Sequence, residues 1–327
     1  MHAFFKDTTV VVTGAAGFLG SHLCQTLLDA GAKVYGIDNY LTGQSKNTDL
    51  LSSNPHYTFI QADVIKNPLE YLPQDIHIDI LLHFASPASP PRYQAYPVET
   101  YLVNSLGTHN LLQYLKNVHP DARFLFASTS EVYGDPAVHP QPETYWGNVN
   151  PNGARSCYDE AKRLGETICG VHQRDFGMNV RMVRIFNTYG PHMDPTDGRV
   201  IPQFISEALS ASTYSIFGDG SQTRSYCYVS DLVNAILLLA AHPDGSGKTV
   251  NIGNPEEHTI LETARIIHDM IRPGAPFEPQ FHPLPSDDPL KRKPDITQAQ
   301  QLLGWQPQIS FTDGLQQTIE YFRSLNR

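Results

Sequence analysis

The chain has 327 residues, of which 40% are hydrophobic and 17% charged, and its formal net charge is −10. This length allows one large domain or two modest ones, and the composition is ordinary for a globular protein. The acidic balance argues against a general nucleic-acid-binding or membrane-surface role, so an anionic substrate must be met by local arginines and backbone amides.

The cysteines and the N-terminal segment indicate a cellular compartment. Cys24, Cys157, Cys169 and Cys227 form no C-x-x-C pair, so we expect reduced thiols in a reducing environment. A first strand that begins near Thr8 leaves no room for a signal peptide, and no apolar run approaches twenty residues. We therefore expect a cytoplasmic protein with no membrane contact. The fourteen histidines show no metal-ligand spacing, so no metal site is predicted.

The first predicted strand, Thr8 to Thr13, leads into a glycine-rich turn and a helix that ends near Ala30. The turn has the pattern G-x-x-G-x-x-G, whose glycines permit a tight turn and close approach to a pyrophosphate, while the helix N-terminus supplies amide donors. Between a strand and a helix this pattern predicts dinucleotide binding. The residues of the turn predicted to bind are Gly14, Gly17, Phe18, Leu19 and Gly20.

The second predicted strand, Lys33 to Ile37, ends at Asp38. An acidic residue at this position accepts hydrogen bonds from ribose hydroxyls and repels a 2′-phosphate, which favours NAD over NADP. A third strand, Tyr57 to Gln61, and a fourth, Ile78 to Ala85, end at the same edge of the sheet. The other residues expected to line the cofactor are Asn39, Tyr40, Thr42, Gly43, Asp63, Val64 and Ala85.

A proline-rich stretch from Pro87 to Tyr93 follows the fourth strand. Three prolines within five residues predict a stiff loop, which either shapes a substrate pocket through Tyr93 or serves only as a rigid connector. A long helix from about Val98 to Asn117 is expected next.

The most informative stretch joins a strand end to a helix. The apolar run Arg123 to Ala127 predicts a buried strand, so the hydroxyls and the carboxylate of Ser128 to Glu131 should emerge at its carboxyl edge. In the helical pattern Arg155 to Phe176, Tyr158 and Lys162 lie four residues apart and share one face. An ammonium beside a phenol should lower the tyrosine pKa. A lone Tyr-x-x-x-Lys has little meaning, but after a dinucleotide motif and a hydroxyl-rich strand end it predicts removal of a proton from an alcohol.

A further strand, Asn179 to Asn187, completes an alternation of strands and helices that predicts a doubly wound parallel sheet. After Pro191 turns and short elements dominate. We expect an NAD-binding Rossmann domain at 1–187, with returning segments near 226–254, and a smaller α/β substrate domain mainly at 188–327. The later elements expected are a strand at Tyr214–Phe217 and helices near Ile201–Ala211, Val229–Ala241, Ile260–Ile271, Ile296–Leu303 and Gly314–Leu325.

Taken together, the chain resembles the extended short-chain dehydrogenase/reductase superfamily of nucleotide-sugar epimerases, dehydratases and decarboxylases. Within it the chain looks most like the UDP-glucuronate decarboxylases, or UDP-xylose synthases. Four stretches carry the likeness: HFASPASPP at 83–91, STSEVYGDP at 128–136, NIGNPEEHTI at 251–260, and DDP at 287–289 with KRKPD at 291–295. The sequence departs from the family pattern at Ala161, usually glycine, and at Leu102, often lysine.

The resemblance implies a mechanism. Tyr158 as phenolate takes the C4 hydroxyl proton while hydride moves from C4 to NAD, which leaves a β-keto acid whose ketone accepts the electrons of the breaking C–C bond. The enolate is then protonated at C5 and hydride returns to C4, so NAD stays bound. By resemblance Thr129 hydrogen-bonds near the C4 oxygen, Ser130 and Glu131 extend towards the sugar, and Lys162 also reaches the nicotinamide ribose.

The resemblance also implies a substrate site and an assembly. Arg224 is expected on the diphosphate of UDP, because a guanidinium suits phosphate oxygens, although a solvated turn arginine is the alternative. Arg292 stands between two lysines, which is usual for a solvated basic loop, but the reaction needs a cation for the substrate carboxylate. Other expected substrate contacts are Tyr93, Asn187, Arg199 and Gln222. The helices near 98–117 and 155–176 are expected to pair with their mates in a homodimer.

Several other functions stay open at this stage. Related 4,6-dehydratases place an Asp-Glu pair where Ser130-Glu131 stands, and most 4-epimerases lack the glutamate. A decarboxylase that releases the 4-keto pentose is a further alternative. A non-catalytic NAD-sensing scaffold is disfavoured, because Glu131, Tyr158 and Lys162 are all present.

Overall fold

A parallel sheet of seven strands forms the centre of the protein, seen in a computed structural model that describes all residues except 1, 211–212, 285–288, 290 and 326–327. From edge to edge the strands are β11 (Thr249–Ile252), β6 (Val180–Ile185), β5 (Arg123–Thr129), β4 (Ile80–His83), β1 (Thr9–Thr13), β2 (Lys33–Asp38) and β3 (Tyr57–Gln61). The strand order reverses beside β1, which is the point where sheets of this kind bind ligands. The predicted doubly wound α/β fold is confirmed.

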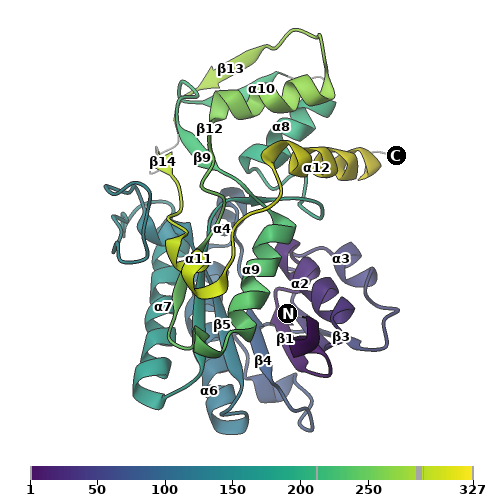
Figure 1. Ribbon diagram of the computed structural model, residues 1–327, viewed down its shortest axis with the longest axis vertical. Helices are drawn as coiled ribbons and strands as arrows, with labels where there is room; N and C mark the ends of the chain where they lie inside the picture. Colours follow the sequence, from purple (N-terminus) through teal and green to yellow (C-terminus); the bar gives the residue numbers. More distant parts are fainter. Residues whose placement is uncertain (1, 211–212, 285–288, 290, 326–327) are drawn as a thin grey trace.

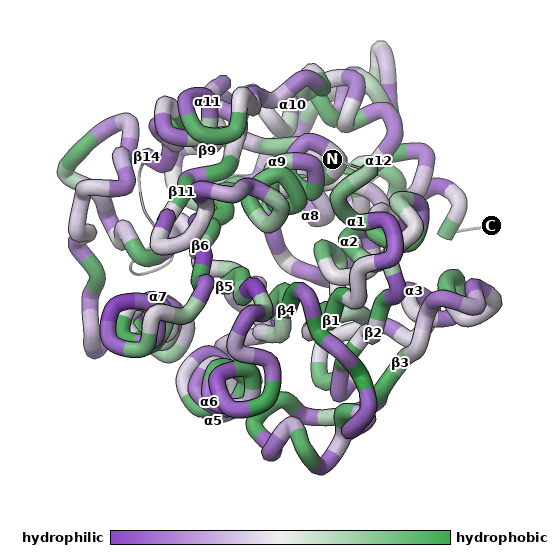
Figure 2. The backbone as a smooth tube through the Cα atoms, turned by 60° about the horizontal axis from the view of Figure 1, so that its bottom comes forward, coloured by the Kyte–Doolittle hydropathy of each residue, from purple (hydrophilic) through white to green (hydrophobic). Residues whose placement is uncertain are grey.

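Helices cover both faces of the sheet (Figure 2). One face carries α5 (Pro97–Leu102), α6 (Thr108–Val118) and α7 (Ser156–Phe176), and the other carries α2 (Phe18–Asp29) and α9 (Val229–Ala241). Successive side chains of a strand point to opposite faces, so Val11 joins the core on the α6 side while Val10 and Val12 join the core on the α2 side. Burial on both faces explains why these strands are continuous apolar runs.

Most elements after β6 group beyond one end of the sheet, where Figure 1 shows α8, α10, α12 and β13 together, whereas β11, α9 and α11 (Thr297–Leu303) return to the seven-stranded sheet. Small sheets here pair β7 (Thr188–Tyr189) with β10 (Cys227–Tyr228), β8 (Tyr214–Phe217) with β13 (Pro279–His282), and β9 (Thr223–Ser225) with β12 (Glu257–Thr259) and β14 (Lys291–Arg292). The helices are α8 (Val200–Leu209), α10 (Ile260–Ile271) and α12 (Phe311–Leu325). Shorter segments elsewhere are α1 (His2–Phe5), α3 (Ser45–Asp49), α4 (Pro90–Ala95) and the 3₁₀ turns Pro68–Glu70, Ser130–Tyr133 and Pro243–Gly245.

The helix predicted from about Val98 to Asn117 is present as a helical stretch from Pro97 to Val118, but it is not a regular α-helix throughout. A π-helical turn, Val103–Gly107, separates α5 from α6. Within this stretch Asn104 donates a side-chain hydrogen bond to Thr100 O at 2.8 Å, and the Thr108 hydroxyl donates to Asn104 O at 2.8 Å. Polar side chains that bond carbonyls one turn back compete with the regular ladder of backbone hydrogen bonds, and the π turn lies at this point of the helix.

The stiff loop predicted from Pro87 to Tyr93 is partly wrong, because α4 begins inside it. Ser89 precedes the helix in an extended conformation and the prolines occupy its first two positions, where a missing N–H costs nothing. The predicted strand Ile78–Ala85 is longer than β4, and β5 continues beyond Ala127 to Thr129. The helix predicted near Ile201–Ala211 ends at Leu209, and Ala211 lies outside the described residues.

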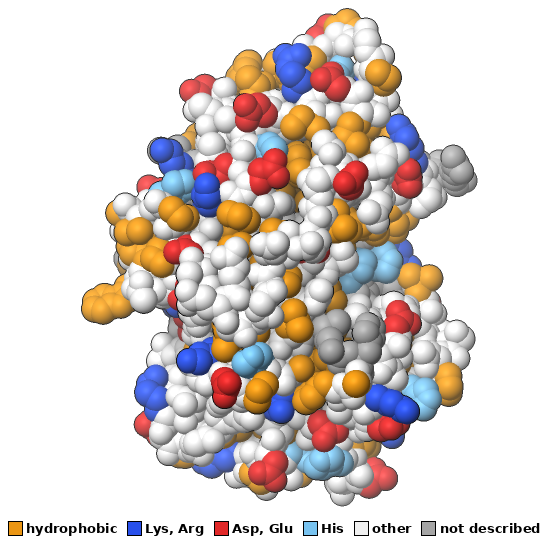
Figure 3. Space-filling model, viewed as in Figure 1, with side chains coloured by type: hydrophobic (Ala, Val, Ile, Leu, Met, Phe, Trp, Pro, Cys, Tyr) orange, Lys and Arg blue, Asp and Glu red, His pale blue; other side chains and the backbone are white. Residues whose placement is uncertain are grey.

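On the face shown in Figure 3, basic and acidic side chains of the described residues are interspersed. Across the same described part of the chain, no helix is both long and apolar enough to cross a membrane.

Candidate active site

In the glycine-rich turn between β1 and α2, the surrounding backbone leaves little room for a side chain at the glycine positions. Gly14 has φ of +75°, and a Cβ on it would lie 2.7 Å from the Phe84 carbonyl. A Cβ on Gly20 would lie 1.9 Å from Gly14 O, whereas a Cβ on Gly17 would lie 3.2 Å from that atom. The turn is therefore held tightly against β4 and the start of α2, which leaves backbone amides at a helix N-terminus as the binding surface.

Asp38 joins this turn to the loop after β2. Its carboxylate accepts the Ala16 N–H at 3.0 Å and the Tyr40 N–H at 2.7 Å, and burial raises its pKa although these bonds oppose the shift. A Cβ on Gly43 would lie 2.9 Å from the same carboxylate. Asp38 thus shapes the loop, in addition to the ribose contact predicted for it.

A cavity of about 510 Å³ lies between the glycine turn, the ends of β5 and β6, and the later elements. The predicted site residues that line it are Gly14, Gly17, Phe18, Leu19, Gly20, Thr42, Tyr93, Thr129, Ser130, Glu131, Tyr158, Lys162, Asn187, Arg199, Gln222, Arg224 and Arg292. The predicted residues that do not line it are Asp38, Asn39, Tyr40, Gly43, Asp63, Val64 and Ala85.

Most of those other residues end or follow β2 and β3, and Ala85 follows β4. The Asn39 side chain donates to Asp63 at 3.2 Å, and the Tyr40 hydroxyl lies 2.8 Å from the Thr48 hydroxyl. Val64 is buried in the core on the α6 side. The sequence signals thus converge on one end of the sheet, with the predicted adenosine contacts outside the main cavity.

The prediction that Lys162 lowers the pKa of Tyr158 is wrong in this structure. Burial raises the Tyr158 pKa well above its ordinary value, against a lowering by a hydrogen bond with Thr129 and by the Arg199 guanidinium. The Lys162 Nζ donates to Ala127 O at 2.7 Å and lies 5.7 Å from the Tyr158 ring centre. Burial also lowers the Lys162 pKa to about 7, so desolvation outweighs the expected attraction between ammonium and phenolate.

Tyr93 reaches the site from α4. Its ring stacks on Tyr158 with centroids 5.0 Å apart and planes 6° apart, and the Cys157 thiol donates to its carbonyl at 3.6 Å. The Tyr93 side chain is buried. The proline-rich segment therefore contributes to the cavity wall instead of serving only as a connector.

Glu131 is bound by two arginines. Arg292 forms two hydrogen bonds with its carboxylate, one of them 2.7 Å long, and Arg155 forms another at 2.7 Å. Although burial opposes ionisation, these guanidiniums hold the pKa of Glu131 at about 2. Arg292 is 4% exposed, which excludes the alternative that it belongs to a solvated basic loop.

Arg155 is a site residue that the sequence reasoning missed. It stands at the N-cap of α7, three residues before Tyr158, and it lines the cavity. Helical spacing was the available signal, because residues three or four apart share a face.

Two of the predicted substrate contacts come together in the small sheet of β9, β12 and β14. Arg224 on β9 is the direct neighbour of Arg292 on β14, and Gln222 is tied to Phe217 O through its side-chain amide. Arg199 is paired with Asp197. The residues 287–288 of the predicted decarboxylase motif lie outside the described residues.

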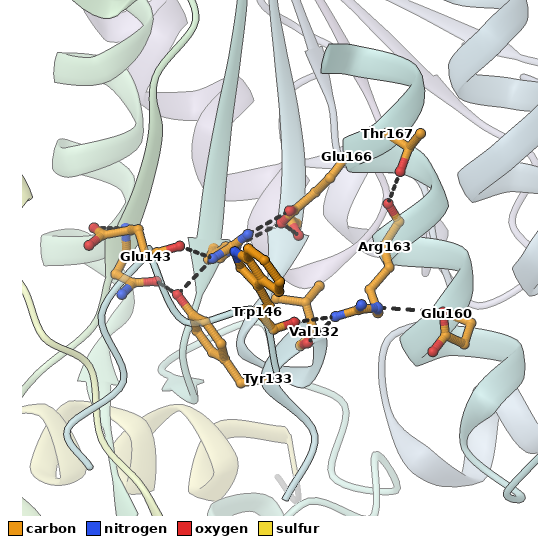
Figure 4. A network of polar contacts seen from close by, with 11 residues as sticks. Val132, Tyr133, Glu143, Trp146, Glu160, Arg163, Glu166 and Thr167 are labelled. Carbon is orange, nitrogen blue, oxygen red and sulfur yellow. Dashed lines mark hydrogen bonds and ion pairs between the residues drawn. The ribbon is translucent and has the colours of Figure 1, made fainter. Parts of the chain in front are cut away.

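A polar network behind the cavity fixes the end of β5 (Figure 4). Arg163 on α7 donates to Val132 O at 3.0 Å and Trp146 O at 2.6 Å. Arg184 on β6 binds Glu166, the Tyr133 hydroxyl and Glu143 O. The network connects β6, α7 and the loop after Tyr133, and therefore holds Thr129 to Glu131 in place.

The fold and the site define an NAD-binding α/β protein of the doubly wound class with further elements beyond one end of the sheet. The family model described as the NAD dependent epimerase/dehydratase family matches residues 10–253, and the chain belongs to this family. Within the described residues, no group of His, Cys, Asp and Glu side chains has the geometry to hold a metal ion.

The curated relatives include a protein named UDP-glucuronic acid decarboxylase 1 from Danio rerio, 46% identical over 96% of this chain and 72% of its own length. A protein of the same name from Arabidopsis thaliana is 47% identical over 98% of this chain and 71% of its own length. A solved UDP-glucuronic acid 4-epimerase from Bacillus cereus, in complex with UDP-glucuronic acid and NAD, has a TM-score of 0.87 at 30% identity and covers 97% of this chain and 100% of that chain.

Proposed function

We propose that this protein is a UDP-glucuronate decarboxylase that uses NAD catalytically and forms UDP-xylose. Identity of 46–47% to relatives of that name along nearly the whole chain supports the reaction. The observation that carries the proposal at the site is the group of buried arginines, Arg155, Arg224 and Arg292, facing one cavity with Tyr158. A substrate with both a diphosphate and a carboxylate requires cations at two places.

The glycine turn fits NAD, since its close contacts exclude a Cβ at Gly14 and Gly20 and leave backbone amides for a pyrophosphate. When bound, NAD supplies the acceptor and donor of the C4 hydride. Tyr158 takes the C4 hydroxyl proton, and Thr129, its hydrogen-bond partner, orients the same oxygen. Because burial raises the pKa of Tyr158, proton removal must be assisted, and the hydrogen bond with Thr129 and the charge of Arg199 both favour the phenolate.

The carboxylate end of the sugar belongs beside Glu131 and Arg292. The 4-keto intermediate is a β-keto acid, so the ketone accepts the electrons of the breaking C–C bond. Arg292 already binds Glu131 in two places, so the substrate carboxylate has to share or displace that partner. An arginine is a poor proton donor, and a water positioned by Glu131 is the proposed source of the C5 proton.

The remaining roles complete the proposal. Residues 188–327 provide most of the nucleotide-sugar site, with Arg224 on the diphosphate.

We propose a cytoplasmic homodimer formed through α5, α6 and α7, because Val98, Leu106 and Leu164 are exposed apolar side chains on these elements and the turn between them. Light scattering should give about twice the 36.4 kDa chain mass, and a monomer at micromolar concentration would refute this assembly.

The decisive experiment incubates the protein with UDP-glucuronate and catalytic NAD, and measures carbon dioxide and the sugar nucleotide formed. We expect carbon dioxide and UDP-xylose. UDP-galacturonate without carbon dioxide would identify a 4-epimerase, and a released 4-keto pentose would show that the final reduction is missing.

Arg292 provides the sharpest variant for this assay. Both Arg292→Ala and Arg292→Lys should cripple carbon dioxide release while NAD binding persists, because neither replacement offers a bidentate fork. Lys291→Ala is the matched control, since this neighbour on β14 is exposed. Near wild-type decarboxylation by Arg292→Ala would show that the carboxylate is held elsewhere.

A further inference from the structure

Two arginines and two carboxylates form a buried cluster beside the cavity. Glu131 binds Arg292 and Arg155, each with a contact of 2.7 Å, and the Arg155 Nε lies 3.9 Å from Asp159 Oδ2. The side chains of Arg292, Arg155, Asp159 and Glu131 are 4%, 10%, 9% and 15% exposed. The cluster is therefore largely removed from water, and its net charge matters energetically.

Asp159 is the weakly held member of this cluster. Its Oδ2 is beyond hydrogen-bonding distance of Arg155, and among the described residues its buried Oδ1 has no hydrogen-bond partner. Glu131 takes the short contacts of both guanidiniums. Burial and repulsion from Glu131 raise the pKa of Asp159 to about 8, against the attraction of Arg155 and Arg292.

The protonation state of Asp159 decides the charge of the cluster. Among these four side chains, two guanidiniums face two carboxylates when Asp159 is ionised, and protonation of Asp159 raises their net charge by one unit. A substrate carboxylate placed beside Arg292 adds one negative charge, and a proton on Asp159 cancels it. An unbalanced buried charge is costly, so the substrate favours the protonated state.

We infer that Asp159 is a positioning residue that carries a proton when UDP-glucuronate is bound, so that binding of the sugar carboxylate is coupled to proton uptake at this side chain. This inference rests on the proposed function. Asp159 does not line the cavity and acts through Arg155 and Glu131. When the carboxylate leaves as carbon dioxide, the negative charge that favoured protonated Asp159 is gone. Above pH 8, Asp159 then releases its proton to solvent.

Other titratable groups face Asp159 from the surrounding elements. Glu131 lies on the 3₁₀ turn after β5, Arg292 on β14, Arg155 and Glu160 on α7. Tyr93 on α4 and Tyr158 and Cys157 on α7 are uncharged near pH 8, because burial raises the pKa of each. Asp159 is accordingly the member expected to gain or lose a proton there.

The test measures proton uptake on binding. A Tyr158→Phe variant loaded with NAD binds the sugar nucleotide without turnover, and calorimetry at pH 9 in two buffers of different ionisation enthalpy counts protons taken up. We expect close to one proton per UDP-glucuronate. The dissociation constant should rise about tenfold per pH unit above pH 8. Adding Asp159→Asn should abolish both effects, whereas Glu160→Gln, an exposed neighbour, should retain them.

UDP-glucose, which lacks the carboxylate, separates the outcomes. Its affinity should be independent of pH in this range and its binding should take up no proton. Absence of proton uptake with UDP-glucuronate in the protein that retains Asp159 overturns the inference, even if Asp159→Asn fails to fold. Equal uptake with UDP-glucose also overturns it. Failure to bind UDP-glucuronate at any pH overturns the proposed function itself.

Discussion

Replacing Glu131 by glutamine tests how much the buried ion pairs stabilise the fold. The pKa of Glu131 falls from 4.5 to about 2 in the folded protein, a difference that corresponds to about 3 kcal/mol of stability. The substitution also leaves Arg155 and Arg292 without their shared carboxylate, and breaking a buried pair typically costs about 3–5 kcal/mol. Asp159 can then ionise beside Arg155 and offset part of this loss. We expect Glu131→Gln to lower the free energy of unfolding by about 3 kcal/mol at pH 7.

The stabilising contribution of Glu131 should decrease as the pH falls. A carboxylate whose folded pKa is depressed stabilises the protein above its unfolded pKa, and that contribution is lost as pH falls through the folded pKa. Because Asp159 titrates near pH 8 only while Glu131 is charged, the pH dependence is compared in an Asp159→Asn background. There the difference between the protein with Glu131 and Glu131→Gln should be constant from pH 6 to pH 8 and shrink by about 1.4 kcal/mol at pH 3.5.

Urea denaturation followed by circular dichroism at one protein concentration measures the difference between the two proteins. Glu160→Gln is the control, because the partly exposed pair of Glu160 with Arg163 at 3.5 Å contributes less than about 1 kcal/mol. A loss below about 1 kcal/mol for Glu131→Gln, or a difference that does not shrink in acid, would contradict the reasoning from burial and pairing.

Three further predictions concern the cofactor and the proton transfer. Tyr158→Phe should reduce formation of the NADH absorbance with UDP-glucuronate by several orders of magnitude while NAD still binds, and retention of more than about a tenth of the rate would place the base elsewhere. Gly20→Ala should abolish NAD binding measured by calorimetry, because its Cβ would lie 1.9 Å from Gly14 O, whereas Gly17→Ala, at 3.2 Å, should weaken it less; equal affinities would refute the packing argument. Asp38 predicts activation by NAD over NADP, and equal activation by the two in the carbon dioxide assay would show that Asp38 is not the discriminator.

The sequence by itself determined the elements that depend on local pattern. The apolar runs and the glycine turn placed β1, α2 and β2 to within three residues of their observed bounds, because hydrophobic periodicity and glycine-dependent turns are short-range properties. Local pattern predicted the helix that contains Asn104 without its π turn, and it failed where prolines begin a helix, as in α4.

Tertiary structure alone decided the electrostatics of the site. Residues 131 and 292 are far apart in the sequence, and the pairing of β14 with β9, together with the bridge between Gln141 and Pro294, brings Arg292 to Glu131. Spacing correctly put Tyr158 and Lys162 on one helix, but the direction of their pKa shifts depends on burial, which no local pattern reveals. Asp159, next to Tyr158 in the sequence, gains its raised pKa from desolvation and from Glu131, because the free energy of a buried charge depends on every group packed around it.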